Sequence, residues 1–158
     1  MALRLEDKRA VVAEVKAAAE TAQSALAAEY SGLTVSEMTE LRKQAREQGV
    51  YLRVVKNTLA RRAIEGTDFE CMQDELSGPL ILAFSQEDPG SAARVVKGFA
   101  KEHEKLVTRM LSIGGEVLPA EDLGRLASLP TLDQARAMLL GVFQAPAIFV
   151  CQNNHWAI

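Results

Sequence analysis

Two strand–helix–strand units follow one another along the chain, and this succession constrains the fold more than any other feature. Apolar residues alternate or run together in the strand segments and recur at helical spacing between them. The segments are a strand at 24–30, a helix at 34–48, a strand at 51–55, a strand at 79–84, a helix at 89–103 and a strand at 106–112. Two such units predict an α+β fold, a ferredoxin-like split βαβ sheet with helices on one face. A doubly wound parallel sheet is the alternative, but four strands are few for it.

Further helices flank and connect these units. A helix is expected at residues 5–22, a short one at 58–65 and another at 119–127. Thr131 and Gln134 form a capping box that starts a C-terminal helix, which Gln144-Ala-Pro146 is expected to interrupt. The apolar stripe of this helix is expected to pack on the body of the protein more than on a partner. We therefore expect a globular α/β domain at 1–128 and a C-terminal region at 129–158.

The charges are segregated along the chain. The net charge of −3 argues against a nucleic-acid partner when it is taken alone. From Arg42 to Arg62, however, seven basic residues face one acid, a balance of +6, whereas residues 67–158 carry seven basic residues and twelve acids, a balance of −5. A polarised molecule of this kind can bind an anion at one end and stay soluble through the other.

The predicted helix at 34–48 carries the first part of the basic stretch. Thr34 and Glu37 form a capping box at its start. The basic side chains lie on one flank of its apolar stripe and the acidic ones on the other. The basic flank is formed by Arg42, Lys43 and Arg46. On this helix alone, a solvated charged face explains the pattern better than an anion site does.

The second part of the basic stretch lies where the next short helix begins. Asn57 and Thr58 are both good capping residues, and Lys56 stands just before them. Free N–H groups at a helix start favour an anion, and the forked guanidinium of arginine can hold a phosphate with two hydrogen bonds. The buried face expected for this helix turns Arg61 and Arg62 outward. A phosphate site or plain caps beside a solvated face are equally compatible with these residues.

Other chemistries find little support in the sequence. The chain has no phosphate-binding glycine loop, no nucleophile with a partnering base and too few histidines and cysteines for a zinc set. We therefore expect no enzyme, no metal and no cofactor. The longest apolar runs are too short to span a membrane and the start has no signal peptide, so a cytoplasmic location is expected. Cys71 and Cys151 are expected to be free, buried or half-buried thiols of no assigned role.

Several motifs at this spacing resemble one known family. They include Tyr30-Ser-Gly-Leu-Thr-Val, Thr39-Glu-Leu-Arg, the run from Gly49 to Leu59 with Lys56-Asn-Thr-Leu, the run from Gly78 to Phe84, and Leu129-Pro-Thr. Together these motifs resemble the bacterial large-subunit ribosomal protein number ten, the stalk-base family, over residues 2–146. The Lys-Asn-Thr-Leu signature is the most specific of them.

The resemblance implies an RNA-binding scaffold of the ribosome. Members of the family bind the GTPase-associated region of large-subunit ribosomal RNA beside ribosomal protein eleven, and carry acidic stalk protein dimers that recruit translation factors. The free complex also binds its own operon messenger RNA and represses translation. Carried onto matching positions and joined with the basic flank, the expected RNA-facing residues are Tyr30, Ser31, Gly32, Arg42, Lys43, Arg46, Arg53, Lys56, Asn57, Thr58, Arg61 and Arg62.

The chain departs from the family after Pro146. Members usually continue with a long charged amphipathic helix that the stalk dimers grip, whereas residues 147–158 contain no charged residue and hold the only tryptophan, Trp156. A truncated, a frame-shifted and a divergent ending all fit this pattern. Dimer docking is accordingly expected to be weakened or lost. The candidate docking residues are Met138, Leu139, Val142 and Phe143.

Overall fold

The computed structural model describes residues 4–103 and 105–153, with side chains described as far as Phe143 in the last helix. Helices and strands alternate through most of the chain, as the apolar pattern predicted. In order the elements are α1 (Leu5–Thr21), β1 (Ser24–Glu29), α2 (Val35–Glu47), β2 (Val50–Val54), α3 (Asn57–Ile64), the 3-10 turn η1 (Glu70–Met72), β3 (Leu80–Ser85), α4 (Ser91–Glu102), β4 (Val107–Ile113), β5 (Glu116–Pro119), the 3-10 turn η2 (Ala120–Asp122), α5 (Leu123–Ala127) and α6 (Leu132–Asn153).

The strands form one antiparallel sheet in the order β2-β3-β1-β4-β5. Strand β3 lies between β1 and β2, and β1 lies between β3 and β4, so each strand–helix–strand unit is split by a strand of the other. This interleaving is that of a ferredoxin-like sheet, and the predicted α+β class is confirmed. The parallel alternative is wrong because neighbouring strands run antiparallel.

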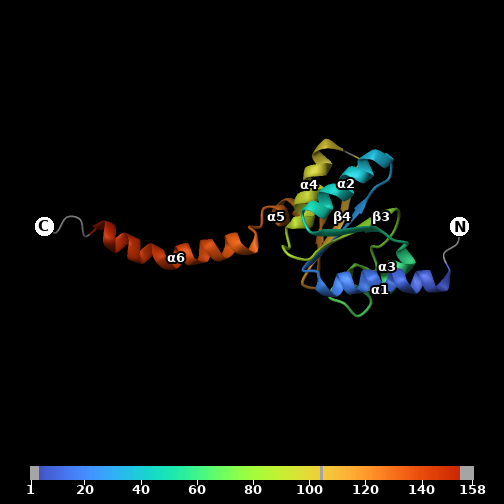
Figure 1. Cartoon of the computed structure of the whole chain (residues 1–158), viewed down its shortest axis with the longest axis horizontal. Coiled ribbons are helices and arrows are strands. Elements are labelled where there is room, and N and C mark those ends of the chain that lie inside the picture. Colours follow the sequence, from blue (N-terminus) through green and yellow to red (C-terminus); the bar gives the residue numbers. More distant parts are fainter. Residues whose placement is uncertain (1–3, 104, 154–158) are drawn as a thin grey trace.

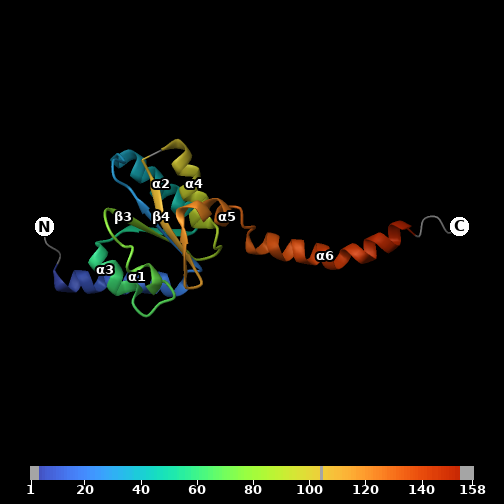
Figure 2. The same ribbon diagram turned by 180° about the vertical axis from the view of Figure 1, so that it is seen from behind.

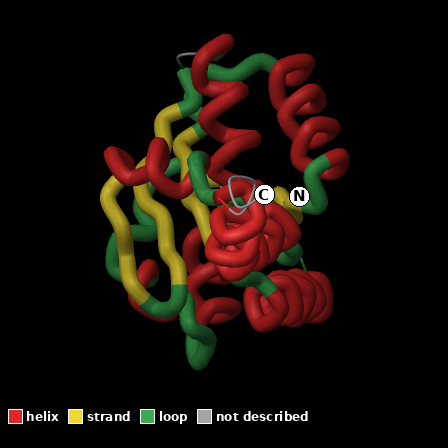
Figure 3. The backbone as a smooth tube through the Cα atoms, turned by 90° about the vertical axis from the view of Figure 1, so that its left-hand side faces the viewer, coloured by secondary structure: helices red, strands yellow, loops and turns green. Residues whose placement is uncertain are grey.

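Helices cover both faces of the sheet, which corrects the expectation of helices on one face only. The crossover helices α2 and α4 pack on one face, and α1 and α3 pack on the other (Figure 1). In Figure 3 the strands lie between these two groups of helices. The cause is that β3 is buried along its whole length and β1 along nearly all of it. Strands without a solvent face need a packed layer on each side.

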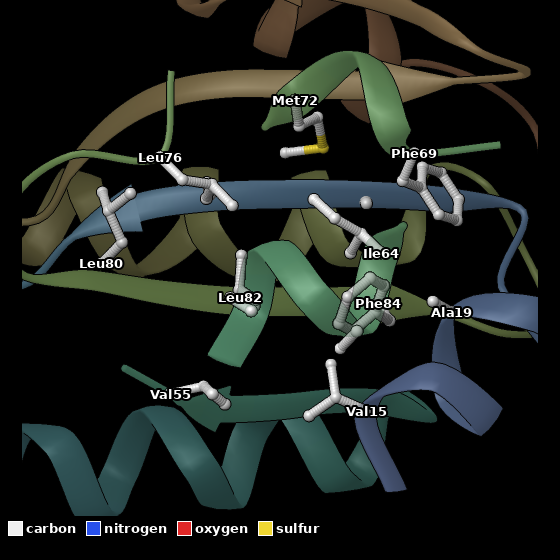
Figure 4. Packing of buried hydrophobic residues seen from close by; sticks show 14 of the residues in the cluster. Val15, Ala19, Val55, Ile64, Phe69, Met72, Leu76, Leu80, Leu82 and Phe84 are labelled. Carbon is white, nitrogen blue, oxygen red and sulfur yellow. The ribbon is translucent and has the colours of Figure 1, made fainter. Parts of the chain in front are cut away.

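The core beneath α1 and α3 centres on Phe84 of β3. Phe84 is 1% exposed, and its ring centre lies 6.0 Å from that of Phe69 and 6.3 Å from that of Tyr51. Figure 4 shows Val15 of α1 and Ile64 of α3 among the side chains gathered in this core. Because these residues are buried, the positions of α1 and α3 are fixed against the sheet, and the polar residues of both helices point outward.

A fifth strand, β5, extends the sheet where the sequence predicted only a turn and a helix. Ile113 pairs with Glu116, and the two glycines between them have φ of 57° and 89°. Two residues at positive φ form a tight hairpin loop that glycine accepts without strain. The helix predicted at 119–127 therefore begins later than expected, as η2 and then α5.

Helix α6 projects away from the globular body (Figures 1 and 2). It runs through Pro146, so the interruption predicted at Gln144–Pro146 is wrong. A proline inside a helix removes one backbone hydrogen bond and adds a clash at a cost of about 3 kcal/mol, and it can kink a helix without ending it. The capping box at its start is present, because the Thr131 hydroxyl accepts from Gln134 N (3.4 Å) and Gln134 Oε1 accepts from Thr131 N (3.2 Å).

Candidate RNA interface

The capping box predicted for α2 is formed and sets the start of the helix. The Thr34 hydroxyl accepts from the backbone N–H of Glu37 (3.4 Å), and a Glu37 carboxylate oxygen accepts from the N–H of Thr34 (2.6 Å). These contacts with Thr34 hold the pKa of the Glu37 carboxyl below its ordinary value. Leu41 and Ala45 of α2 are buried against the sheet. The basic flank predicted on this helix, Arg42, Lys43 and Arg46, is therefore exposed.

A hollow of about 560 Å³ follows the edge strand β2, and we call it the β2 hollow. Arg42 and Arg46 of α2 line it together with Arg53 of β2. Glu14 of α1 is the one acid in its lining, and the other lining residues are those of Val50–Val54. Guanidinium groups from a helix and from the strand that follows it thus line the same edge of the sheet. Lys43 is exposed nearby on α2 but does not line the hollow.

Arg53 is already engaged inside the β2 hollow. Its Nη1 forms an ion pair with the Glu14 carboxylate and donates to the Tyr51 hydroxyl (3.0 Å), which in turn donates to Glu14 Oε1 (2.9 Å). The Arg53 guanidinium, and after it the Tyr51 hydroxyl, hold the pKa of the Glu14 carboxyl below its ordinary value. An incoming phosphate therefore has to compete with Glu14 for Arg53.

A second hollow, of about 380 Å³, adjoins the first at Val54, and we call it the α3 hollow. It brings Tyr30, which follows β1, beside Lys56, Asn57 and Thr58 at the start of α3. Ser31 and Gly32 are exposed in the turn after Tyr30 but do not line this hollow. The predicted RNA-facing loop and the predicted helix start are thus adjacent in the fold.

The cap of α3 differs from the prediction. Lys56 occupies the N-cap position, and its carbonyl accepts from the N–H groups of Leu59 (2.8 Å) and Ala60 (3.0 Å). No side chain caps the helix, because the lysine side chain at the N-cap has no acceptor atom. The Asn57 side-chain NH2 donates instead to the carbonyl of Gly78 (2.9 Å). Asn57 therefore ties α3 to the segment that leads into β3.

Arg61 and Arg62 are both exposed, as predicted, but they do not act together. The Arg61 guanidinium donates to the carbonyls of Gln73 (3.1 Å) and Leu76 (2.9 Å), so it supports the segment around η1. Arg62 lies apart from the α3 hollow and lines a groove between α1 and α3. The two guanidiniums thus have different surroundings, and a phosphate contact by both remains a prediction.

Residues of α1 were missed by the sequence reasoning. Glu14 lines the β2 hollow, and Lys8, Arg9 and Lys16 line the groove beside Arg62. The three cations recur at helical spacing with Val12, which is a signal that the sequence did contain. The contact between Glu14 and Arg53 had no such signal, because the two residues come from different elements.

The candidate docking residues for a stalk protein lie on α6. Met138 is 62% exposed, Leu139 58%, Val142 70% and Phe143 72%, so the expectation that this stripe packs on the body is wrong. At the start of α6, Leu132 N–H donates to the Asp88 carboxylate on the body (3.1 Å). An apolar stripe of this exposure is typical of a surface that a partner covers.

The described part of the chain was also searched for reactive thiols, metal ligands and membrane-spanning helices. Cys71 is a free thiol but is exposed, not buried as expected, and the side chain of Cys151 and residues His155 and Trp156 lie outside the described residues. Among the described residues, no cluster of three or more histidine, cysteine or acidic side chains suits a metal ion. No described helix combines the length and apolar character that a membrane span requires.

Comparison with known proteins shows that the chain is similar to ribosomal protein L10 over most of its length. A family model described as Ribosomal protein L10 matches residues 4–101, and one described as Ribosomal protein uL10 C-terminal region matches residues 129–148. A protein named large ribosomal subunit protein uL10 from Methylococcus capsulatus is 66% identical over 146 residues, which cover 92% of this chain and 83% of that protein. Proteins of the same name from Thioalkalivibrio sulfidiphilus and Alkalilimnicola ehrlichii are each 64% identical over the same shares of both chains.

Proposed function

The chain belongs to the ribosomal protein L10 family, and on this premise we propose that it binds large-subunit ribosomal RNA through the basic surface around β2. As a member of that family it is a structural protein of the large ribosomal subunit. The RNA that we propose is the GTPase-associated region of that subunit. The observation that carries the proposal is the convergence of cations from α2, β2 and the start of α3 on two adjoining hollows. Those of α2 and α3 are exposed, whereas Arg53 of β2 is half-buried.

The charges of this surface suit a phosphate backbone. Arg42, Arg46 and Lys56 are exposed, and none of them forms an ion pair among the described side chains. Glu14 is the single acid in the lining of the two hollows. Contacts from such residues fix the position of an RNA on the protein, and recognition of a folded RNA then depends mainly on its shape.

A titration of the full chain with an RNA fragment of this region, at several salt concentrations, tests the proposal. If about four phosphates are neutralised, the logarithm of the affinity falls with the logarithm of salt at a slope near −3. Replacing both Arg42→Glu and Arg46→Glu should flatten the slope by about two. A flat response of the unmodified chain would favour the alternative, a protein-only interaction module whose basic stretch is a solvated face.

The matched control makes the same change of charge elsewhere. Lys101→Glu with Arg136→Glu alters exposed cations on α4 and α6 and should leave the slope unchanged. Arg61→Glu is unsuitable as a probe because it would release the carbonyls of Gln73 and Leu76. A control variant that lost as much binding as the α2 variant would contradict the assignment of the site.

We also propose for this chain the other functions that the family suggests, which are contacts with ribosomal proteins and translational regulation. The globular domain, residues 1–128, would lie beside ribosomal protein eleven in the cytoplasmic ribosome and, in the free protein, bind its own operon messenger RNA as a translational regulator. No catalysis and no cofactor are proposed for it. The region at 129–158 would dock acidic stalk protein dimers through the exposed stripe of α6.

We expect this docking to be weakened or lost relative to a charged amphipathic helix, because residues 147–158 offer no charged side chain. Mixing the full chain with acidic stalk dimers and measuring the mass of the complex tests this. Weak binding that disappears when Leu139→Asp and Val142→Asp are introduced would support it. Tight binding of two or more dimers would contradict it.

A further inference from the structure

The groove between α1 and α3 carries a second basic surface, which lies outside the two hollows described above. It has a volume of about 460 Å³ and is lined by Leu5, Lys8, Arg9, Val12, Ala13, Lys16, Leu59 and Arg62. The residues from α1 are spaced at i, i+3, i+4, i+7, i+8 and i+11, so they form one continuous stripe along the helix. We call this surface the α1–α3 groove.

The charges of the groove are of one sign. Four cations line it, and none of the acids of α1, which are Glu6, Asp7, Glu14 and Glu20, does so. Arg9 and Arg62 form no ion pair among the described side chains. By contrast, the arginines of α4, β4, α5 and α6 each have an acidic partner, and these are Arg94, Arg109, Arg125 and Arg136. The α1–α3 groove therefore keeps its positive charge uncompensated.

The length of the stripe indicates the kind of ligand. Arg9 and Lys16 are seven positions apart on a straight helix, which is about 10 Å of its axis. Cations spread over this distance match a chain of negative charges better than a single small anion. Aliphatic side chains form part of the lining, so the groove can also cover the apolar parts of such a chain.

The position of Arg62 connects the groove with the proposed RNA interface. Arg62 lies four residues after Thr58 on α3, so the two side chains occupy the same face of that helix. Thr58 lines the α3 hollow and Arg62 lines the α1–α3 groove. One polyanion can therefore pass from one surface to the other along α3.

We propose that the α1–α3 groove is a second contact surface for the RNA backbone, which continues the interface from the start of α3 onto α1. The inference rests on the proposed binding of ribosomal RNA. It assigns to α1 the contacts made by Lys8, Arg9, Lys16 and, with α3, by Arg62.

The test uses the full chain and the same RNA fragment. Arg9→Glu with Lys16→Glu should lower the affinity about tenfold or more at low salt and flatten the salt slope by about two. Lys101→Glu with Arg136→Glu is the control of equal charge. Thermal unfolding of each variant checks that the fold is kept. If charge reversal disturbs α1, the neutral variant Arg9→Gln with Lys16→Gln replaces it in the same titration.

Backbone footprinting separates this inference from the proposed function. We expect Arg9→Glu with Lys16→Glu to lose protection at one stretch of the RNA while the stretch that depends on Arg42 and Arg46 stays protected. If the α1 variants bind and protect the RNA as the control does, while the α2 variant is impaired, the groove inference is wrong and the proposed function stands. If the unmodified chain binds the RNA without salt dependence, the proposed function itself fails.

Discussion

Single residues decide how much of the basic surface is free to meet an anion. Arg53 is engaged by Glu14 and Tyr51, and Arg61 is engaged by two backbone carbonyls. Arg42 and Lys56 have no such partner among the described side chains. We therefore expect changes at Arg42 or Lys56 to act on binding, and changes at Arg61 to act mainly on stability.

Glu14→Gln is predicted to make stability less dependent on pH. The pKa of the Glu14 carboxyl is lower in the folded protein than in the unfolded chain, first because of Arg53 and then because of Tyr51. The carboxylate thus stabilises the fold above its unfolded pKa, about 4.3, and this contribution is lost as the pH falls through the folded value. Thermal unfolding should show Glu14→Gln below the unmodified chain at pH 7, with the difference in unfolding temperature shrinking as the pH falls through the lowered folded pKa.

The control for this prediction lies on the same helix. Glu20 is exposed and forms no ion pair among the described side chains. Glu20→Gln should therefore leave the difference in unfolding temperature between neutral and acidic pH as it is in the unmodified chain. An equal effect of both substitutions would mean that net charge, and not the contact with Arg53, governs the response.

At the scale of elements, the β4–β5 hairpin depends on the conformation of its two glycines. Gly115 has φ of 89°, and a Cβ there would meet nothing closer than the Asp68 carbonyl oxygen at 3.7 Å. The strain is therefore in the backbone, and Gly115→Ala should lower the free energy of unfolding by about 1–2 kcal/mol. Gly98→Ala, in the middle of α4 with open space around it, should instead raise that free energy by about 0.8–1 kcal/mol. Denaturant titration measures both, and a shift in the same direction would contradict the conformational explanation.

The attachment of α2 to the sheet supports the basic flank. Leu41 is 1% exposed, and Leu41→Ala should lower the free energy of unfolding by about 2–5 kcal/mol because it leaves a cavity under the helix. Val35 is 86% exposed on the same helix, and Val35→Ala should change stability by less than about 0.5 kcal/mol. Equal losses at the two positions would show that α2 is not held by its buried face.

At the scale of the whole molecule, the described part of α6 projects away from the body (Figure 1). The described apolar side chains on the outer part of α6 are more than half exposed, and these are Met138, Leu139, Leu140, Val142 and Phe143. A chain that ends at Pro130 should therefore unfold with a free energy within about 1 kcal/mol of the full chain, since the loss is mainly the hydrogen bond from Leu132 to Asp88. Calorimetry tests this, and a large drop in the unfolding temperature would show that α6 packs on the body.

The truncated chain also separates the two proposed functions. It should bind the RNA fragment with the affinity of the full chain, because the β2 hollow, the α3 hollow and the α1–α3 groove all lie in residues before 81. It should no longer bind acidic stalk dimers. Loss of RNA binding on truncation would place part of the RNA interface on α6. It would contradict the assignment of RNA binding to the body and of dimer binding to α6.

The sequence by itself determined the features that depend on neighbours along the chain. The alternation of strands with helices follows from apolar periodicity, and the capping boxes at Thr34 and Thr131 involve residues three positions apart. The interleaved sheet followed from two successive strand–helix–strand units. The family motifs, such as Lys56-Asn-Thr-Leu, are likewise runs of neighbouring residues. Interactions between residues that are close in the sequence determine these features, so the sequence alone predicts them.

Only the tertiary structure decided which cations are free and which surfaces they share. The Tyr51 hydroxyl meets Glu14 across 37 positions of the chain, and Arg61 meets the Leu76 carbonyl across 15. The second helical layer likewise depends on contacts between residues that are distant in sequence, and the exposure of α6 depends on how that helix leaves the body. The pairing of β5 with β4 is instead local, across the Gly114–Gly115 turn. Hydrogen bonds and ion pairs act over a few ångströms in space. The periodicity of residues along the chain therefore does not predict which distant residues form them.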